Sequence, residues 1–278
     1  MECFGDYYYL DGIIIPADHD DEIVSGEVSF YEVIRTREGI PLFFDDHMKR
    51  LSDGISTRYE TGGDISSRVR EGLDALVALQ SFPEINVRVR VTFTGQDYSL
   101  HICYIPSSYP DTAMVTTGVR LILYHAERFD PGVKLLNNRL RLSVNVALAR
   151  KKAYEALLVN RDGLITEGSR SNVFFVTGNG AIHTAPDKMV LSGITRRYVT
   201  DIIRQEGFEL VYEAVDESEI AHFTSVFITG TSPMVLPVNC IEKQQYEAYN
   251  PVTERLRRLY AGLAGESIRN YKLSKSKD

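Results

Sequence analysis

The sequence predicts an α+β fold made of two domains. Its 278 residues are enough for one large domain or two modest ones. Alternating strand patterns and amphipathic helical patterns occur in both halves of the chain. Residues 106–118 contain two prolines and several small polar residues, which is typical of a connection between domains. We therefore expect a small α/β domain at 1–107, a linker at 108–118 and a larger domain at 119–278.

The first domain is expected to combine two hairpins with two helices. The hairpins turn at Asp11-Gly12 and at Glu38-Gly39. A helix over 45–60 is expected to have Asp45 or Asp46 as its N-cap. Periodicity gives the remaining features: a helix face of Met48, Leu51 and Ile55, a second helix over 64–80, and strands over 86–95 and 99–106.

The second domain is expected to be rich in strands. Apolar runs predict strands over 119–127, 155–160, 163–166, 172–176, 208–215 and 225–230, and helices over 141–155, 195–207 and 251–265. Gly207 is the expected stop of the middle helix. The lysine-rich end of the chain is expected to be disordered.

Composition narrows the possible functions. The net charge of −7 and the pI near 5.5 argue against a nucleic-acid backbone as the main partner. No apolar run approaches the length of a membrane span, and no signal peptide opens the sequence. Cys3, Cys103 and Cys240 are scattered and show no metal-ligand spacing, so we expect no metal and a reducing, cytoplasmic setting.

One lysine differs from the others in its setting. The chain has nine lysines against 22 arginines, and Lys134 lies among apolar neighbours in the stretch PGVKLLNN. Burial disfavours the ammonium form, which suits a lysine that forms a Schiff base. The alternative is a lysine whose stem covers an apolar edge while its head reaches water, and spacing alone favours that alternative.

An unusually polar corner separates the strands at 163–166 and 172–176. Its residues are Glu167-Gly168-Ser169-Arg170-Ser171-Asn172. Beside a heteroaromatic cofactor, Glu167 could keep a ring nitrogen protonated. Taken alone, an acid at the end of a strand more often caps a turn.

Other groups in the chain could hold an anion. Gly193, Ile194 and Thr195 open a predicted helix, where free amides and the helix dipole favour a phosphate. Thr231 and Ser232 follow a strand end. The remaining candidate is Arg50, whose guanidinium could grip a phosphate. Each has a simpler alternative, such as threonine as an N-cap or arginine on a solvated helix face.

As an ordered set, these motifs identify a resemblance to the class IV, or fold type IV, pyridoxal-phosphate aminotransferases. That family includes branched-chain and D-amino-acid aminotransferases and 4-amino-4-deoxychorismate lyase. The motifs cover nearly the whole chain: FYEVIR, DDHMKRL, VKLLNN, EALLVNRDGLITEGSRSNVFFV, LSGITRRYV and VFITGTSPMVLPV. The resemblance implies a fold type IV enzyme whose larger domain has a β-barrel-like sheet core, acting as a homodimer with pyridoxal 5'-phosphate.

The resemblance also implies a role for each site residue. Lys134 would be the Schiff-base lysine and proton carrier, and Glu167 would pair with the pyridine nitrogen. The phosphate would be held by Arg50, Gly193, Ile194, Thr195 and Thr231, while Leu191 packs beneath the ring and Asn172 braces the cofactor loop. Tyr31 would face the substrate from the partner subunit's small domain, and Ser232 would share in holding it.

The chain departs from the family pattern in two places. Asn138 stands where many relatives have a tyrosine aimed at the cofactor's 3-hydroxyl group. The usual RxH motif for the substrate carboxylate is missing, and Arg88 and Arg90 share one face of a strand instead. Arg90 is the favoured substitute, and two exposed strand arginines are the alternative.

Three functions remain open from the sequence. The first is an aminotransferase acting on an amino acid and a 2-oxo acid. The second is 4-amino-4-deoxychorismate lyase, which gains support from Asn138 and loses some from Glu32 after Tyr31. The third is a non-catalytic small-molecule-binding protein, which would need neither Lys134 nor Glu167.

Overall fold

The computed structural model describes residues 3–17, 28–60 and 64–275. The chain divides into two compact units. The first comprises Met1–Ser108, Val133–Leu136 and Ala264–Asp278, and the second comprises Tyr109–Gly132 and Asn137–Leu263. Val133–Leu136 and Ala264–Asp278 therefore belong to the first unit, although the sequence-based range 119–278 assigned both segments to the larger domain.

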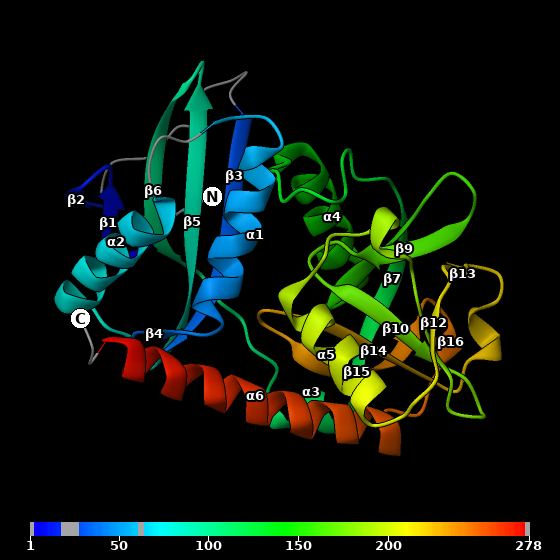
Figure 1. The fold of residues 1–278 in the computed structure, drawn as a ribbon. Coiled ribbons are helices and arrows are strands. Elements are labelled where there is room, and N and C mark those ends of the chain that lie inside the picture. Colours follow the sequence, from blue (N-terminus) through cyan, green and yellow to red (C-terminus); the bar gives the residue numbers. More distant parts are fainter. Residues whose placement is uncertain (1–2, 18–27, 61–63, 276–278) are drawn as a thin grey trace. The chain divides into compact units, whose positions relative to one another are not determined.

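The first unit is a six-stranded antiparallel sheet with two helices on one face (Figure 1). Its strand order is β2-β1-β6-β5-β3-β4. The elements are β1 (Phe4–Leu10), β2 (Ile13–Pro16), β3 (Val28–Arg37), β4 (Ile40–Pro41), α1 (Phe44–Ser56), α2 (Ile65–Leu79), β5 (Glu84–Thr94) and β6 (Asp97–Ile105). Both predicted hairpins are confirmed, because β1 pairs with β2 around Asp11-Gly12 and β3 pairs with β4 around Glu38-Gly39.

The start of α1 differs from the expected cap. The residue before the helix is Phe43, in the left-handed conformation at φ 52°, and no side chain caps the helix. Asp45 and Asp46 lie inside the first turn, where their charges interact favourably with the helix dipole. The expected apolar face is confirmed, since Met48, Leu51 and Ile55 are buried. This face packs in the core cluster that also holds β3 and β5 side chains.

The second unit is built on a ten-stranded mixed sheet. The strand order is β12-β11-β10-β14-β15-β7-β8-β9-β13, with β16 paired to β15, and no closed barrel forms among the residues described. The strands are β7 (Val119–His125), β8 (Glu155–Val159), β9 (Leu164–Gly168), β10 (Asn172–Val176), β11 (Ile182–Thr184), β12 (Leu210–Tyr212), β13 (Val215–Asp216), β14 (Ser225–Gly230), β15 (Met234–Ile241) and β16 (Gln244–Gln245). The expected single strand over 208–215 is two short strands that pair with different neighbours.

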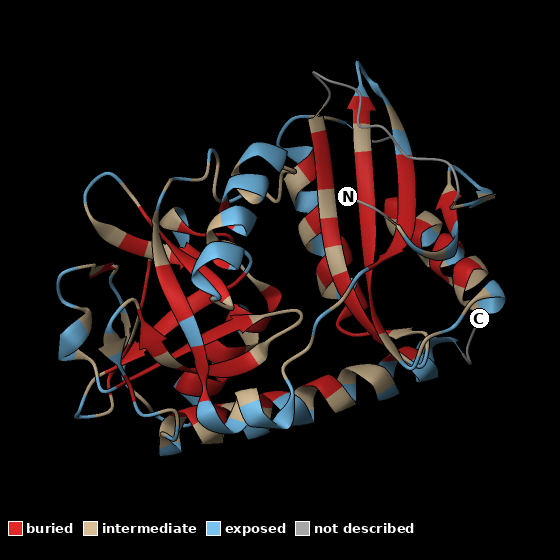
Figure 2. Ribbon diagram, turned by 180° about the vertical axis from the view of Figure 1, so that it is seen from behind, coloured by how far each residue is buried: buried red, intermediate tan, exposed pale blue. Residues whose placement is uncertain are grey.

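Helices surround this sheet. They are α3 (Thr112–Thr117), α4 (Asn138–Lys151), α5 (Ile194–Gln205), the start of α6 (Pro251–Lys275) and the 3-10 turns Asp187–Met189 and Ile220–His222. Short helix α3 lies within the expected linker and is capped by Asp111. Buried residues follow the strands of the sheet, where the ribbon in Figure 2 is red. The sheet is therefore a rigid support for the polar groups at its strand ends.

The lysine-rich tail is helical as far as Lys275, so the expectation of disorder is wrong for that part, and its last residues, 276–278, lie outside the described residues. Helix α6 continues to Lys275, ten residues beyond the expected end of this helix. Within the first unit, the Tyr271 ring packs edge-on against Phe44 at 5.6 Å, and Lys275 Nζ lies 2.5 Å from Asp74 Oδ1. Tyr271 anchors this segment to the first unit, although the lysines around it in the sequence suggested a solvated tail.

Candidate active site

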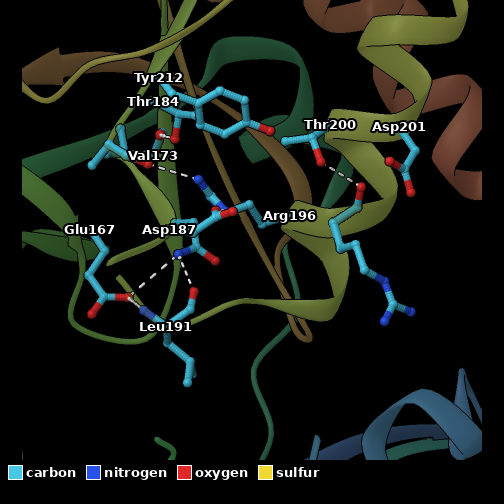
Figure 3. Close-up of polar contacts among 12 residues, drawn as sticks. Glu167, Val173, Thr184, Asp187, Leu191, Arg196, Thr200, Asp201 and Tyr212 are labelled. Atoms are coloured by element: carbon cyan, nitrogen blue, oxygen red, sulfur yellow. Dashed lines mark hydrogen bonds and ion pairs between the residues drawn. The ribbon is translucent and has the colours of Figure 1, made fainter. Parts of the chain in front are cut away.

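Glu167 is a buried carboxylate near the end of β9. Its side chain is almost inaccessible to solvent, and its Oε2 atom accepts a hydrogen bond of 3.1 Å from the Leu191 amide (Figure 3). The Asn172 side-chain amide also donates to Oε2, at 3.5 Å. On the other side, Arg128 Nε forms an ion pair with Oε1 at 3.0 Å. The positive charge of Arg128 thus lies beside the buried acid.

Asn172 and Gly193 fix the loop that carries Leu191. The Asn172 amide donates to the Leu191 carbonyl at 3.0 Å. A Cβ added to Gly193 would lie only 2.2 Å from Asn172 Oδ1, so a larger residue at 193 would displace Asn172. Gly193 has φ −64° and ψ 136°, which other residues also adopt. Close approach, and not backbone conformation, therefore requires glycine here.

A second buried acid, Glu155, organises the polar corner. Its carboxylate accepts hydrogen bonds from the Ser169 hydroxyl at 2.6 Å, the Ser171 hydroxyl at 3.0 Å and the Arg170 amide at 3.1 Å. It also accepts from the Ala156 amide at 2.8 Å. This explains the serines at 169 and 171, because they supply donors to an acid inside the sheet.

The first turn of α5 lies next to this corner. The helix begins at Ile194 after Gly193, without a capping side chain, so its first amides have no partner within the helix. The Thr195 hydroxyl lies 3.0 Å from the Tyr260 hydroxyl. Arg196 is buried and is held by Asp187 and by the Ala185 carbonyl (Figure 3). The Thr195 hydroxyl thus contacts α6, and the first backbone amides of α5 are donors of the kind that can hydrogen-bond an anion.

Thr231 and Ser232 lie at the same end of the sheet as Glu167. Strand β10 starts at Asn172, which pairs with Thr229 near the end of β14. A Cβ on Gly230 would come within 3.3 Å of the Arg170 carbonyl, so the turn after β14 lies against the polar corner. The structure therefore brings together all the predicted residues of the second unit: Glu167, Asn172, Leu191, Gly193, Ile194, Thr195, Thr231 and Ser232.

The first unit holds the lysine. Lys134 lies on a short segment that pairs with β3, where the Tyr31 amide donates to the Lys134 carbonyl at 3.2 Å. Its Nζ atom is 4.8 Å from the centre of the Tyr31 ring of the same chain. Flanking residues Val133 and Leu135 pack against the core of this unit. The apolar setting expected for Lys134 is therefore present.

Arg50 is tied to a buried acid. Its Nε atom donates to Glu32 Oε1 at 2.7 Å, and a terminal nitrogen donates to Oε2 at 2.6 Å. His47 Nδ1 lies 2.7 Å from the same Oε2. Burial raises the pKa of Glu32, but Arg50 and His47 outweigh it and hold that pKa below its ordinary value. Burial lowers the pKa of His47, only partly offset by Glu32. Arg50 is thus oriented by Glu32 and is not simply solvated.

Arg88 and Arg90 are both buried, so the alternative of two exposed arginines is wrong. In the sheet register Arg90 stands opposite Tyr31 on β3, and Arg88 stands opposite Val33. Alternate residues of a strand share a face. Arg90, Arg88, Tyr31 and Val33 therefore lie on the same face of the sheet.

Sequence reasoning missed Arg128 and Glu155. Arg128 precedes Lys134 by six residues, and besides its ion pair with Glu167 it donates to the Ser169 carbonyl at 2.8 Å. Glu155 opens an otherwise apolar strand. An acid at the start of a fully buried strand was the available signal, whereas nothing in the sequence singled out Arg128.

No helix in the described part of the chain is long and apolar enough to cross a membrane. Comparison with known proteins gives relatives of several activities. The chain is 30% identical over 229 residues to a D-alanine aminotransferase of Bacillus licheniformis, covering 77% of this chain and 79% of that protein. It is 22% identical over 267 residues to an aminodeoxychorismate lyase of Bacillus subtilis, covering 90% and 89%.

Solved structures agree on the fold. A T.th. branched-chain amino acid aminotransferase, solved with pyridoxamine 5'-phosphate, superposes with a TM-score of 0.82 at 22% identity and covers 98% of each chain. A branched-chain aminotransferase of Thermoproteus uzoniensis, solved with norvaline, gives a TM-score of 0.80 at 20% identity, covering 95% of this chain and 96% of that one. Residues 29–241 match the profile of the amino-transferase class IV family, and the chain belongs to that family.

Proposed function

We propose that this protein is a pyridoxal 5'-phosphate-dependent aminotransferase that moves an amino group between an amino acid and a 2-oxo acid. The observation that carries the proposal is the buried Glu167 carboxylate, fixed by Leu191 and Asn172 and paired with Arg128. A buried acid of this kind suits a protonated pyridine nitrogen. When bound, the cofactor withdraws electrons from the α-carbon of the amino acid.

The second-unit residues fit the cofactor's phosphate and ring. The uncapped first turn of α5 offers the amides of Ile194 and Thr195 to a phosphate. Gly193 keeps the space beside Asn172 clear of a Cβ, and the buried, apolar Leu191 would contact the cofactor ring. Thr231 adds a hydroxyl at the same end of the sheet, and Arg50 adds a positive charge.

In the first unit, Lys134 is the residue proposed to hold the cofactor covalently and to carry protons to and from the substrate. Its apolar flanks favour the neutral amine that both tasks need. Arg90 is proposed to hold the substrate carboxylate, with Tyr31 and Ser232 lining the substrate's place. Arg90 is suited because a buried guanidinium offers a directed, charge-assisted contact. We further propose a cytoplasmic homodimer.

The second candidate is aminodeoxychorismate lyase activity. Asn138 opens α4 where many family members have a tyrosine, and a relative with that activity covers 90% of this chain. The lyase reaction would use the same Lys134 and Glu167. The two candidates therefore differ in substrate and not in the cofactor residues.

The test is a labelling experiment followed by a substrate screen. Borohydride reduction of the yellow purified protein and peptide mapping should place the pyridoxyl group on Lys134, and Lys134→Ala should abolish turnover. A label on another lysine would refute the assignment. D- and L-amino acids with 2-oxo acid acceptors are then compared with aminodeoxychorismate. Pyruvate release from aminodeoxychorismate without amino transfer would favour the lyase.

A further inference from the structure

Three side chains able to bind a metal converge on the sheet of the first unit. Cys3 immediately precedes β1, and His101 and Cys103 are alternate residues of β6 that share one face. Their ligand atoms all lie within 4.8 Å of one another. Cys3 Sγ is 3.8 Å from His101 Nε2. His101 and Cys103 are buried, and Cys3 is partly exposed.

The spacing of these atoms suits a tetrahedral metal ion. With zinc bonds of about 2.3 Å to sulfur and 2.0 Å to nitrogen, tetrahedral ligand atoms lie roughly 3.5–3.8 Å apart. The Cys3 Sγ–His101 Nε2 distance of 3.8 Å is about 0.3 Å longer than the sulfur–nitrogen value of about 3.5 Å, and no pair of ligand atoms would need to approach by more than about 1.3 Å. Thiolate and imidazole ligands select zinc over magnesium or calcium, which prefer oxygen.

Neighbouring residues prepare the site. Arg88, which stands opposite Cys103 in the register, donates to Cys103 Sγ at 3.3 Å. This contact fixes the position of the Cys103 sulfur. The Tyr8 ring packs against the His101 imidazole with centres 4.9 Å apart, which restricts its orientation. Two thiolates and one neutral imidazole would together balance the charge of a zinc ion.

We propose that Cys3, His101 and Cys103 bind one zinc ion, with water in the fourth position, and so fasten the residue before β1 to β6. The expectation of no metal rested on the spacing of the cysteines along the chain. Cys3 and Cys103 are 100 positions apart and meet only because β1 pairs with β6. Metal bound to the folded state should raise the stability of this unit by mass action.

The experiment uses the full-length chain with its own N-terminus, purified under reducing conditions and dialysed against zinc. We expect one zinc per chain, with X-ray absorption showing two sulfur ligands and one histidine nitrogen. Cobalt in its place should give the visible bands of a tetrahedral ion. These bands are preferable to the near-ultraviolet thiolate band, where a pyridoxal cofactor also absorbs.

Variants distinguish a built site from adventitious binding. Cys3→Ser, at a partly exposed position, should keep the fold and lose the cobalt bands. Cys240→Ser, at the remaining cysteine, should keep them because Cys240 lies in the other unit. Wild-type protein that takes up no zinc, or Cys3→Ser that binds it as tightly as wild type, would overturn the proposal. Zinc-free wild type with a Cys3–Cys103 disulfide would identify a redox pair and overturn it as well.

Discussion

At the scale of single residues, two buried charged groups matter most to the proposed reaction, and each is held in a different way. Glu167 lies among donors that fix its position before any ligand binds. Arg90 lies on a strand whose neighbours fix its register opposite Tyr31. Preorganised charges of this kind avoid a reorganisation cost when substrate binds. Replacing Glu167 should therefore lower mainly kcat, and replacing Arg90 should raise mainly the KM of the amino donor, while the fold is retained.

Glu167→Gln should retain the fold and lower kcat by several orders of magnitude. Glutamine has nearly the same shape, but it cannot keep the pyridine nitrogen protonated, so the ring becomes a poorer acceptor of electrons. Single-turnover kinetics on the cofactor-loaded variant measure this directly. Cofactor content and circular dichroism serve as controls, and near-normal turnover would remove Glu167 from its proposed role.

Arg90→Ala should raise the KM for the amino donor while leaving cofactor affinity nearly unchanged. Loss of a charge-assisted contact in a buried site should cost about 2–4 kcal/mol, equivalent to a change of roughly 30- to 1,000-fold. Steady-state kinetics and a cofactor titration are the two measurements. Unchanged donor kinetics in a folded Arg90→Ala variant would show that the carboxylate is held elsewhere.

At the scale of elements, the site depends on close contacts between strand ends and helix starts. Gly193→Ala tests the contact between α5 and β10, because its Cβ would collide with Asn172 Oδ1. We expect a loss of about 1–3 kcal/mol in stability and a cofactor Kd raised about tenfold or more. Gly262→Ala is the matched control. Residue 262 lies in α6 with no atom within 4 Å of an added Cβ, so alanine should be neutral or stabilising by up to about 1 kcal/mol.

A double variant locates the cause of the Gly193 effect. If the collision with Asn172 is responsible, Gly193→Ala combined with Asn172→Ala should be less harmful than the sum of the two single changes. Additive losses would place the effect elsewhere, as would a Gly193→Ala protein that binds cofactor as tightly as wild type.

Helix α1 is joined to β3 by the ion pair of Arg50 with Glu32. The pKa of Glu32 is lowered in the folded state, so its stabilisation is full above its ordinary pKa of 4.5 and is lost as pH falls below that value. Glu32→Gln should cost up to about 3 kcal/mol at pH 7, since Arg50 is partly exposed. The difference from wild type in urea-unfolding free energy should shrink in acid.

The control for Glu32→Gln is Asp53→Asn on the same helix. Asp53 pairs with Lys49 on the exposed side of α1, where both side chains are more than half accessible. Its loss should change the free energy of unfolding by less than about 0.5 kcal/mol. A Glu32→Gln difference that stays constant between pH 7 and strongly acid pH would contradict the assigned pKa shift.

The sequence predicted which segments are helices and strands better than it predicted where they end and which distant residues they contact. Turn residues and periodicity located the hairpins, most strands and most helices, because burial on one face leaves a regular pattern. The same signals misplaced the cap of α1, since Phe43 adopts a conformation that only the surrounding fold selects. Arg128 and the meeting of Cys3 with Cys103 depend on contacts between distant segments, which no local spacing records. Glu155 differs, because an acid at the start of an apolar strand is itself a local signal.

At the scale of the whole molecule, the proposed homodimer has a candidate surface. Leu142 and Val146 lie one turn apart on α4 and are 65% and 69% exposed. These two apolar side chains share one helix face, and burying them against a partner would remove apolar surface from water. Leu142→Glu should therefore shift sedimentation toward the monomer, whereas Lys188→Glu, a charge change in the exposed 3-10 turn Asp187–Met189 of the same unit, should not.

The dimer also raises the question of which chain supplies Tyr31. The family resemblance implies the partner, but here the Tyr31 ring lies 4.8 Å from Lys134 Nζ of the same chain. We therefore expect Tyr31 to act with the lysine of its own chain. Co-expression of Tyr31→Ala with Lys134→Ala chains should then give mixed dimers without a complete site, and activity no higher than that of the Tyr31→Ala parent. If the tyrosine were supplied across the dimer, random assembly would restore about one quarter of wild-type sites. Recovery of that fraction would show that the partner subunit supplies Tyr31. Full activity of a protein that sediments only as a monomer would contradict the proposed dimer.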